Sequence, residues 1–225
     1  MKKALSFLLV LCVFIAGSSC NKRSPNDHKP YFNFYNFSPG SQALVMLVDN
    51  SSFFPDGVEY RKSGGYNAPY IYDNTGTQRI SIQTKVSSAK YLQTDIHMQD
   101  DYTYAVFAAG IPFSMQQLTI PSYPTFGSNC KIRFVNLCPD CDTVNLTLNG
   151  TNYTGKVPYL SASDYVEVAP GTYLTEARNT AGSFITSDRT SVYSGYQTVN
   201  VVLSGYKAPA DTTFNPVITI VPEVQ

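Results

Sequence analysis

The cysteines are the residues whose spacing most directly suggests chemistry. Cys138 and Cys141 enclose Pro139-Asp140 with the spacing of a thiol-redox motif, but that chemistry relies on a helix N-terminus to lower a thiol pKa. Because strand-like segments flank the motif, we expect Cys138 and Cys141 to form a disulfide in an oxidising compartment instead, worth roughly 2 kcal/mol. Cys130 lies eight residues earlier, about 26 Å along an extended strand, and is expected to be buried and free. Three cysteines with no nearby histidine do not provide the four ligands of a zinc site.

The two histidines offer little for catalysis. His28 lies in a polar N-terminal segment, whereas His97 shares a strand face with Asp95 and precedes Asp100 and Asp101. That acidic neighbourhood suits either weak cation binding or a polar outer face before a turn. The sequence contains no Gly-x-Ser-x-Gly motif and no phosphate-cradling glycine loop. We therefore predict a protein that is not an enzyme and that uses no cofactor or metal.

Tyrosines give the best sequence indication of a binding surface. Four tyrosines gather around a glycine-containing loop, Ser63–Gly65; they are Tyr60, Tyr66, Tyr70 and Tyr72. The last three are our candidate ligand-binding residues. Tyrosine offers flat contact area and a hydroxyl at low entropic cost, which suits peptide or sugar recognition. The alternative is that these rings pack in the core or at its rim.

The composition limits the partners and the fold class. The chain is 43% hydrophobic and only 14% charged, which is typical of a folded domain rather than of a disordered chain. Its 16 basic and 16 acidic residues balance, so nucleic acid is not an expected partner. The 14 Gly, 14 Pro and 17 Tyr, together with many β-branched runs, favour a β protein with many turns.

The N-terminus has the pattern of an export signal. Met1–Lys3 is basic, Ala4–Gly17 is apolar but short for a membrane span, and two serines precede Cys20. This arrangement resembles a bacterial lipoprotein signal, which implies that residues 1–19 are removed and that Cys20 carries the lipid. Residues 20–30 are polar and would act as a flexible tether. We expect a membrane partner through this anchor, at either face of the outer membrane.

The rest of the chain contains an internal repeat. Phe34–Pro39 lines up with Phe134–Pro139 at an offset of 100 residues, and Thr103–Gly110 lines up with Thr198–Gly205 at an offset of 95. Several blocks in the same order favour a tandem duplication. We predict one unit over residues 31–122 and a second over 129–225, with Tyr123–Asn129 as the joint.

Each unit shows the period-two alternation of short strands. In the second unit Phe134 alternates with Arg133, and Val199 and Val201 alternate with Thr198 and Asn200, which predicts strands with one solvent-exposed face. Turn residues recur about every 10 residues. We therefore expect an all-β protein of two tandem immunoglobulin-like antiparallel sandwiches.

One sequence pattern also resembles a known family. The segment Ile132–Asp140, the later Asn149-Gly150 and the segment Asp164–Tyr173 are similar to a tandem-repeat family of unknown function, whose modules occur in bacterial cell-envelope lipoproteins. The first unit matches less well, because Gly40 replaces the aspartate. The resemblance implies β-sandwich modules and brings no catalytic residues.

These observations predict a non-catalytic outer-membrane lipoprotein that acts in adhesion, in scaffolding or as an accessory subunit. The alternative is a glycan- or peptide-binding accessory protein for nutrient uptake. In either case the expected partner is a protein or a glycan. A third hypothesis is a hydrolytic enzyme, which would require a pocket that joins paired carboxylates.

Overall fold

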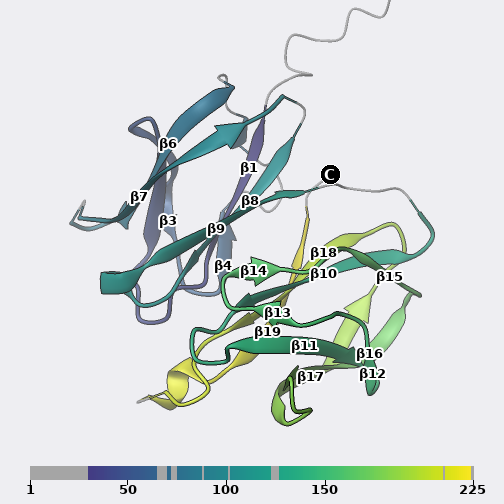
Figure 1. The fold of residues 1–225 in the computed structure, drawn as a ribbon. Coiled ribbons are helices and arrows are strands. Elements are labelled where there is room, and N and C mark those ends of the chain that lie inside the picture. Colours follow the sequence, from purple (N-terminus) through teal and green to yellow (C-terminus); the bar gives the residue numbers. More distant parts are fainter. Residues whose placement is uncertain are drawn as a thin grey trace, which may run out of the picture.

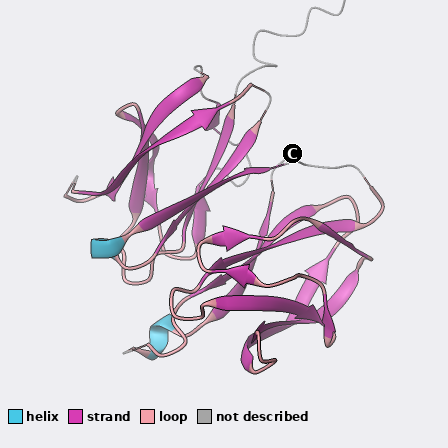
Figure 2. Ribbon diagram, viewed as in Figure 1, coloured by secondary structure: helices cyan, strands magenta, loops and turns pink. Residues whose placement is uncertain are grey.

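The computed structural model describes residues 30–64, 70–71, 75–87, 89–100, 102–122, 127–209 and 211–223. Within these ranges the protein is all-β, with two short 3-10 turns, as Figure 2 shows. Four sheets form two sandwiches, over about residues 30–122 and 130–222 (Figure 1). The predicted all-β fold with two sandwiches is confirmed. No helix in these ranges has the length and apolar character that crossing a bilayer requires.

The first sandwich consists of an inner and an outer sheet. The inner sheet has the order β4 (Lys62–Gly64), β1 (Tyr31–Asn36), β8 (Thr103–Ala109) and β9 (Gln116–Ser122), with β5 (Tyr70–Ile71) also paired to β1. The outer sheet has the order β3 (Ser51–Val58), β2 (Leu44–Val48), β6 (Gly76–Thr84) and β7 (Lys90–Met98). The turn η1 (Pro112–Ser114) connects β8 to β9.

The second sandwich repeats this order. Its inner sheet contains β14 (Ser161–Ala162), β10 (Cys130–Leu137), β18 (Thr198–Ser204) and β19 (Val217–Pro222), with β15 (Val166–Val168) also paired to β10. Its outer sheet contains β12 (Thr151–Asn152), β11 (Thr143–Leu148), β16 (Gly171–Asn179) and β17 (Phe184–Tyr193), with β13 (Val157–Pro158) also paired to β11. The turn η2 (Thr212–Phe214) connects β18 to β19.

One strand pair in each sandwich is parallel, which the alternation pattern does not distinguish from antiparallel pairing. Phe34 in β1 pairs with Val106 in β8, and Phe134 in β10 pairs with Val201 in β18. Parallel neighbours need a long connection, and most of each sandwich lies between the two strands.

Each sandwich has its own apolar core between its two sheets. In the first, Phe34 and Met46 are fully buried, and in the second Phe134 and Leu146 are fully buried. A third apolar cluster joins the two inner sheets to each other; it includes Tyr35 and Phe107, whose rings stack at 4.9 Å, and Val135 and Val202 from the second sandwich. The inner sheets are therefore covered on both faces.

This contact corrects the expectation of one solvent-exposed face per strand. Arg133, Thr198 and Asn200 were predicted to face solvent, but they are 5%, 1% and 0% exposed. The polar side chains of the inner sheets are buried because the face that carries them packs against the other sandwich. Arg133 Nε donates to Asn200 Oδ1 at 3.0 Å, which satisfies part of this buried polarity.

Candidate functional site

A groove runs along one side of the first sandwich, where the edges of its two sheets separate. It encloses about 400 Å³. Its walls come from edge strands β7 and β9, from the residue that follows η1, and from one residue of the second sandwich; they are Leu92, Thr94, Ile96, Met115, Gln116, Gln117, Thr119 and Leu160. These residues are uncharged, so the groove suits a ligand surface that is itself neutral.

The wall formed by β7 is an incompletely covered part of the core. Leu92 and Ile96 lie on the core-facing side of β7, together with the buried Met98, yet both remain partly exposed. The neighbouring Met115 is buried at the base of the groove. Burial of such aliphatic side chains is favourable at about 25 cal/mol per Å², so a ligand that covered them would gain affinity.

The wall formed by β9 carries polar residues at positions that face the core, where apolar residues are usual. Gln117 and Thr119 point into the groove, and Gln117 Nε2 donates to Thr119 Oγ1 at 2.6 Å. The buried Gln117 Oε1 has no hydrogen-bond partner among the described residues. An unpaired buried amide oxygen costs about 1–3 kcal/mol, so this side chain is poorly explained by stability alone.

The second sandwich closes the equivalent space with isoleucine. Gln117 pairs with Ala108 and Ile218 pairs with Leu203, so the strand registers make Gln117 equivalent to Ile218, and likewise Thr119 to Ile220. Ile218 belongs to the second core, and Ile220 packs against it. Strands β17 and β19 also pack against each other more closely than β7 and β9 do. The polar pair on β9 therefore distinguishes an open groove from a closed core.

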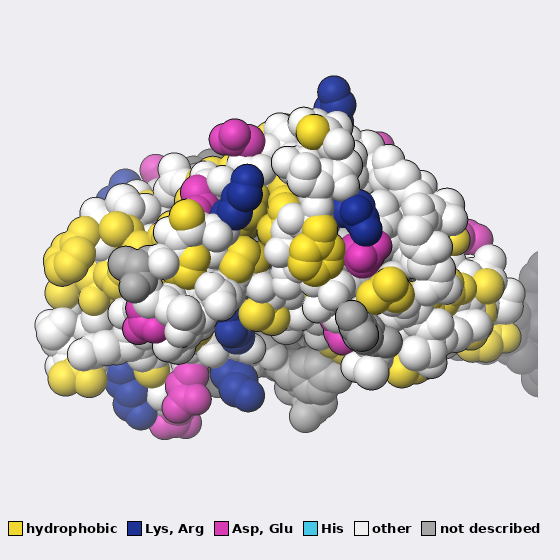
Figure 3. Space-filling view, turned by 90° about the horizontal axis from the view of Figure 1, so that it is seen from below, with side chains coloured by type: hydrophobic (Ala, Val, Ile, Leu, Met, Phe, Trp, Pro, Cys, Tyr) yellow, Lys and Arg dark blue, Asp and Glu magenta, His cyan; other side chains and the backbone are white. Residues whose placement is uncertain are grey.

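An apolar tip lies beside this groove. Ile111 and Phe113 are 44% and 96% exposed at the turn η1. The equivalent of Phe113 in the second sandwich is Phe214, whose ring packs against Tyr60 of the first sandwich with 6.2 Å between ring centroids. Figure 3 shows one face of the molecule, on which hydrophobic side chains gather between scattered charged groups. Uncovered apolar groups of this kind are common at contact sites.

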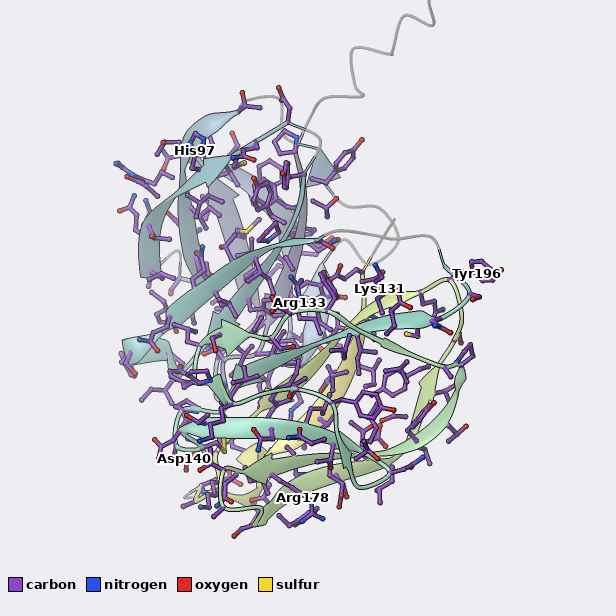
Figure 4. The ribbon with its side chains drawn as sticks, turned by 45° about the vertical axis from the view of Figure 1, so that its right-hand side comes forward. His97, Lys131, Arg133, Asp140, Arg178 and Tyr196 are labelled. Carbon is purple, nitrogen blue, oxygen red and sulfur yellow. A yellow bond between two sulfur atoms is a disulfide. The ribbon has the colours of Figure 1, made fainter. Side chains whose placement is uncertain are left out.

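A buried ion pair of the second sandwich lies where the two sandwiches meet, and its groups also bond to the first sandwich. Arg133 Nη2 donates to Glu223 Oε1 at 2.7 Å, and both side chains are almost completely buried. Tyr165 and Ser122 donate their hydroxyl groups to the same carboxylate, and Arg133 Nη1 donates to the Pro121 carbonyl at 2.8 Å. Ser122 and Pro121 belong to β9, so the strand that borders the groove is fixed from the second sandwich. Figure 4 places Arg133 between the two sandwiches.

The structure places the predicted cysteines as follows. Cys138 and Cys141 are joined by a disulfide, with Cα atoms 5.4 Å apart. Cys130 is buried and free, and burial raises the pKa of its thiol to about 11, which keeps it protonated and unreactive at neutral pH. Asp140 accepts hydrogen bonds from the backbone N–H groups of Lys207 and Ala208, so this carboxylate holds the long loop before η2.

The other predicted residues are not brought into a common site. His97 is exposed on the outer side of β7, and Asp95 next to it forms an ion pair with Arg79 at 3.1 Å. Cys20, Tyr66 and Tyr72 lie outside the described residues. Tyr70 is part of β5, and its side chain lies outside the described part.

Sequence reasoning missed the groove, although one signal for it was present. The aligned strands contain Gln117-Leu118-Thr119 in the first unit and Ile218-Thr219-Ile220 in the second. Polar and apolar positions are exchanged between the two strands. Only the pairing register shows which of these positions face the core.

Comparison with known proteins identifies one domain by family. Residues 130–220 match the model of a domain of unknown function, DUF4397, so the second sandwich is a DUF4397 domain. Comparison with curated proteins gives no match.

Among solved structures, the chain is similar to CBMbc, a family CBM26 module of Eubacterium rectale Amy13K crystallised with maltoheptaose. The identity is 11%, over 88% of this chain and 98% of that chain, with a TM-score of 0.26.

Proposed function

We propose that this protein is a non-catalytic outer-membrane lipoprotein that acts by binding a partner in the groove between β7 and β9, as a scaffold, adhesin or accessory subunit. The observation that carries the proposal is a difference between the equivalent strands β9 and β19. At two core-facing positions β9 has polar residues where β19 has isoleucines. Gln117 and Thr119 keep the groove open and polar, whereas Ile218 and Ile220 close the same space in the second sandwich. A site that costs stability and serves no packing role suits binding.

Three of the carboxylates have structural roles, which suits a binding protein. Glu223 receives the buried Arg133, and Glu176 pairs with Arg178 at 3.1 Å. Asp211 accepts from the backbone N–H of Thr213, and this hydrogen bond lowers the pKa of the Asp211 carboxyl. These acids hold the structure in place, whereas catalytic acids and bases are usually arranged around a shared pocket.

The proposed lipid anchor rests on the N-terminal sequence. Residues 1–19 would be removed and Cys20 would be acylated, which leaves a short segment before the folded part begins. Pro30, the last residue of the predicted tether, is already buried. Mass spectrometry of the protein from its own cells tests this: the expected N-terminal peptide starts at an acylated Cys20, and an unmodified internal Cys20 would refute the anchor.

We also propose that the two sandwiches are immunoglobulin-like modules that arose by duplication. The same asparagine orders the same turn in both, because Asn36 Nδ2 donates to the Val58 carbonyl at 2.9 Å and Asn136 Nδ2 donates to the Val157 carbonyl at 3.1 Å. Together with the shared parallel pairing, this supports a common origin that sequence matching detects only in part.

The binding proposal is tested by capture in cells. The lipidated protein is crosslinked mildly in its own cells, and the partners retained by the wild type are compared with those of Gln117→Ile combined with Thr119→Ile. This variant, called groove-filled below, gives β9 the two isoleucines that β19 carries at the equivalent positions. A matched control, Thr172→Ile with Gln197→Ile, places the same changes at exposed positions of the second sandwich.

We expect one or more partners to be lost with the groove-filled variant and kept with the control. If the groove-filled variant retains every partner, the groove is not the binding site and the proposal fails. Loss on changing Tyr66, Tyr70 and Tyr72 to Ala instead would move the site to that loop.

A further inference from the structure

We propose that the groove, in the binding role suggested above, takes an extended polypeptide segment of a partner protein, which pairs with β9 as an additional strand. The inference rests on the proposed function and adds to it the class of ligand and its mode of binding. Three features carry it: the free backbone groups of β9, the aliphatic surfaces on both sides of that edge, and the neutral lining.

The free edge of β9 follows from the hydrogen bonds of its neighbour. Phe37 N donates to the Ala108 carbonyl at 2.9 Å, so the even-numbered residues of β8 direct their backbone groups toward β1. The odd-numbered residues of β8 therefore bond to β9, where their partners are the even-numbered residues. Consequently Gln117, Thr119 and Pro121 turn their backbone groups away from the sheet.

The second sandwich limits this edge at one end. Pro121 has no N–H, and its outward carbonyl accepts the hydrogen bond from Arg133. Gln117 and Thr119 are left with two N–H and two C=O groups that face the open side. An added strand pairs with groups of this kind and obtains affinity from main-chain hydrogen bonds.

The aliphatic surfaces match the alternation of a strand. Successive side chains of an added strand point to opposite faces. On one face they would meet Leu92 and Ile96, and on the other they would meet Leu160, which lines the groove and also packs in the cluster that joins the sandwiches. The groove is thus continuous with an interface that already buries apolar side chains.

The second sandwich indicates what should fill the space. Ile218 and Ile220 occupy the equivalent region there, which implies that the partner supplies aliphatic side chains at alternate positions. The residues that line the groove carry no charge, so the inward side chains of the partner are expected to be uncharged. Among the described residues that line the groove there is no aromatic ring that could stack on a sugar, which favours a polypeptide over a glycan.

The test uses a synthetic strand as the probe. An end-blocked heptapeptide of alternating Thr and Ile, with a Lys added for solubility, is titrated into the full mature protein and followed by NMR. We expect shifts of the Gln117 and Thr119 amides in the wild type and in the Thr172→Ile, Gln197→Ile control. The groove-filled variant is expected to bind at least about tenfold more weakly.

Two changes separate strand pairing from other binding. N-methylation of only the Ile or only the Thr residues of the probe blocks one edge of the added strand, so one of the two peptides should lose binding and the other should keep it. Thr119→Pro removes an N–H that bonds to no strand of the protein, so the fold should persist while affinity falls about tenfold. Thr119→Ala should keep affinity within about threefold.

Each remaining outcome refutes the inference in a distinguishable way. If both N-methylated peptides bind equally well, the groove does not bind by strand pairing. If a neutral glucan hexasaccharide produces the groove shifts and the peptide does not, the ligand is a glycan and only the proposed function survives. If neither probe binds and the groove-filled variant captures every cellular partner, the proposed function fails as well.

Discussion

The turn that follows the first strand is held by hydrogen bonds in the first sandwich and by a disulfide in the second. In the first, Ser41 Oγ bonds to the Asn36 amide, and the Ser38 hydroxyl donates to the Gly110 carbonyl. In the second, the residues at the positions of these two serines are Cys138 and Cys141, which form a disulfide. The turn geometry is shared although the bonds that hold it are not. The fold therefore tolerates a change in chemistry where the shape is kept.

The edge strands show the opposite relation. β9 and β19 have the same pairing and register, yet their core-facing residues differ in polarity and the shape of the space beside them differs too. Because the two strands share one fold, the fold alone does not explain why the space beside β9 is open and the space beside β19 is closed. Comparison of two units within one chain thus separates residues that serve architecture from residues that serve binding.

The largest expected effect comes from breaking the buried ion pair that lies where the two units meet. Glu223→Ala leaves Arg133 buried without its carboxylate, which should lower the free energy of unfolding by about 3–5 kcal/mol in denaturant titration. Glu167→Ala is the control, because the Glu167 side chain is exposed and accepts a hydrogen bond from Asn129 at 3.2 Å. A loss below about 1 kcal/mol for Glu223→Ala would mean that the buried pair does not contribute to stability as expected.

The next largest effect is expected when the groove residue Gln117 and its equivalent in the second unit, Ile218, are each replaced by the other residue type. Ile218→Gln buries an amide in an apolar core and should lower the free energy of unfolding by about 2–4 kcal/mol. The reciprocal Gln117→Ile removes an unpaired amide oxygen and should raise it by about 1 kcal/mol. Thermal and denaturant unfolding measure both. Equal signs for the two changes would contradict the assigned equivalence.

A smaller effect is expected from making the turns alike. Cys138→Ser with Cys141→Ser gives the second unit the serines of the first and should lower the free energy of unfolding by about 2 kcal/mol, because the unfolded chain is less constrained. Adding a reductant to the wild type should reproduce this loss and should leave the double variant unchanged. If the double variant responds to the reductant, the disulfide does not account for the effect.

The smallest effect concerns alkaline pH. Burial raises the pKa of Cys130 from 9.0 to about 11, so the folded protein holds this proton more tightly than the unfolded chain does. Stability from this group is present below pH 9 and is lost as pH rises toward 11. Between pH 9 and pH 11 the free energy of unfolding should fall less for Cys130→Ala than for the wild type, as measured by denaturant titration at each pH. Identical pH profiles would show that the thiol does not contribute.

Much of the fold could be predicted from residue periodicity and turn chemistry. Asn149 and Gly150 both have positive φ between β11 and β12, as the expected tight hairpin requires. The parallel pairs and the burial of Arg133 and Asn200 could not be predicted, because both depend on contacts between segments distant in sequence. Period two indicates two distinct faces of a strand, but it does not say whether the polar face meets water or another sheet.

The groove could not be predicted for a related reason. Gln117 and Thr119 look like ordinary edge-strand residues until the register shows that they face a core. The tyrosines drew attention because of their residue type, whereas the groove is defined by a mismatch between two equivalent positions. A mismatch of this kind becomes visible only after the strands of both units have been aligned in space.

The parallel pairing of β1 with β8 has a mechanical consequence. If the chain is tethered at its N-terminus, tension enters the folded part at Tyr31 and acts along β1, in the middle of its sheet. The hydrogen bonds to β8 would then be loaded in shear and would have to rupture together rather than open one after another. A protein built in this way would resist mechanical unfolding when a bound partner pulled against its anchor.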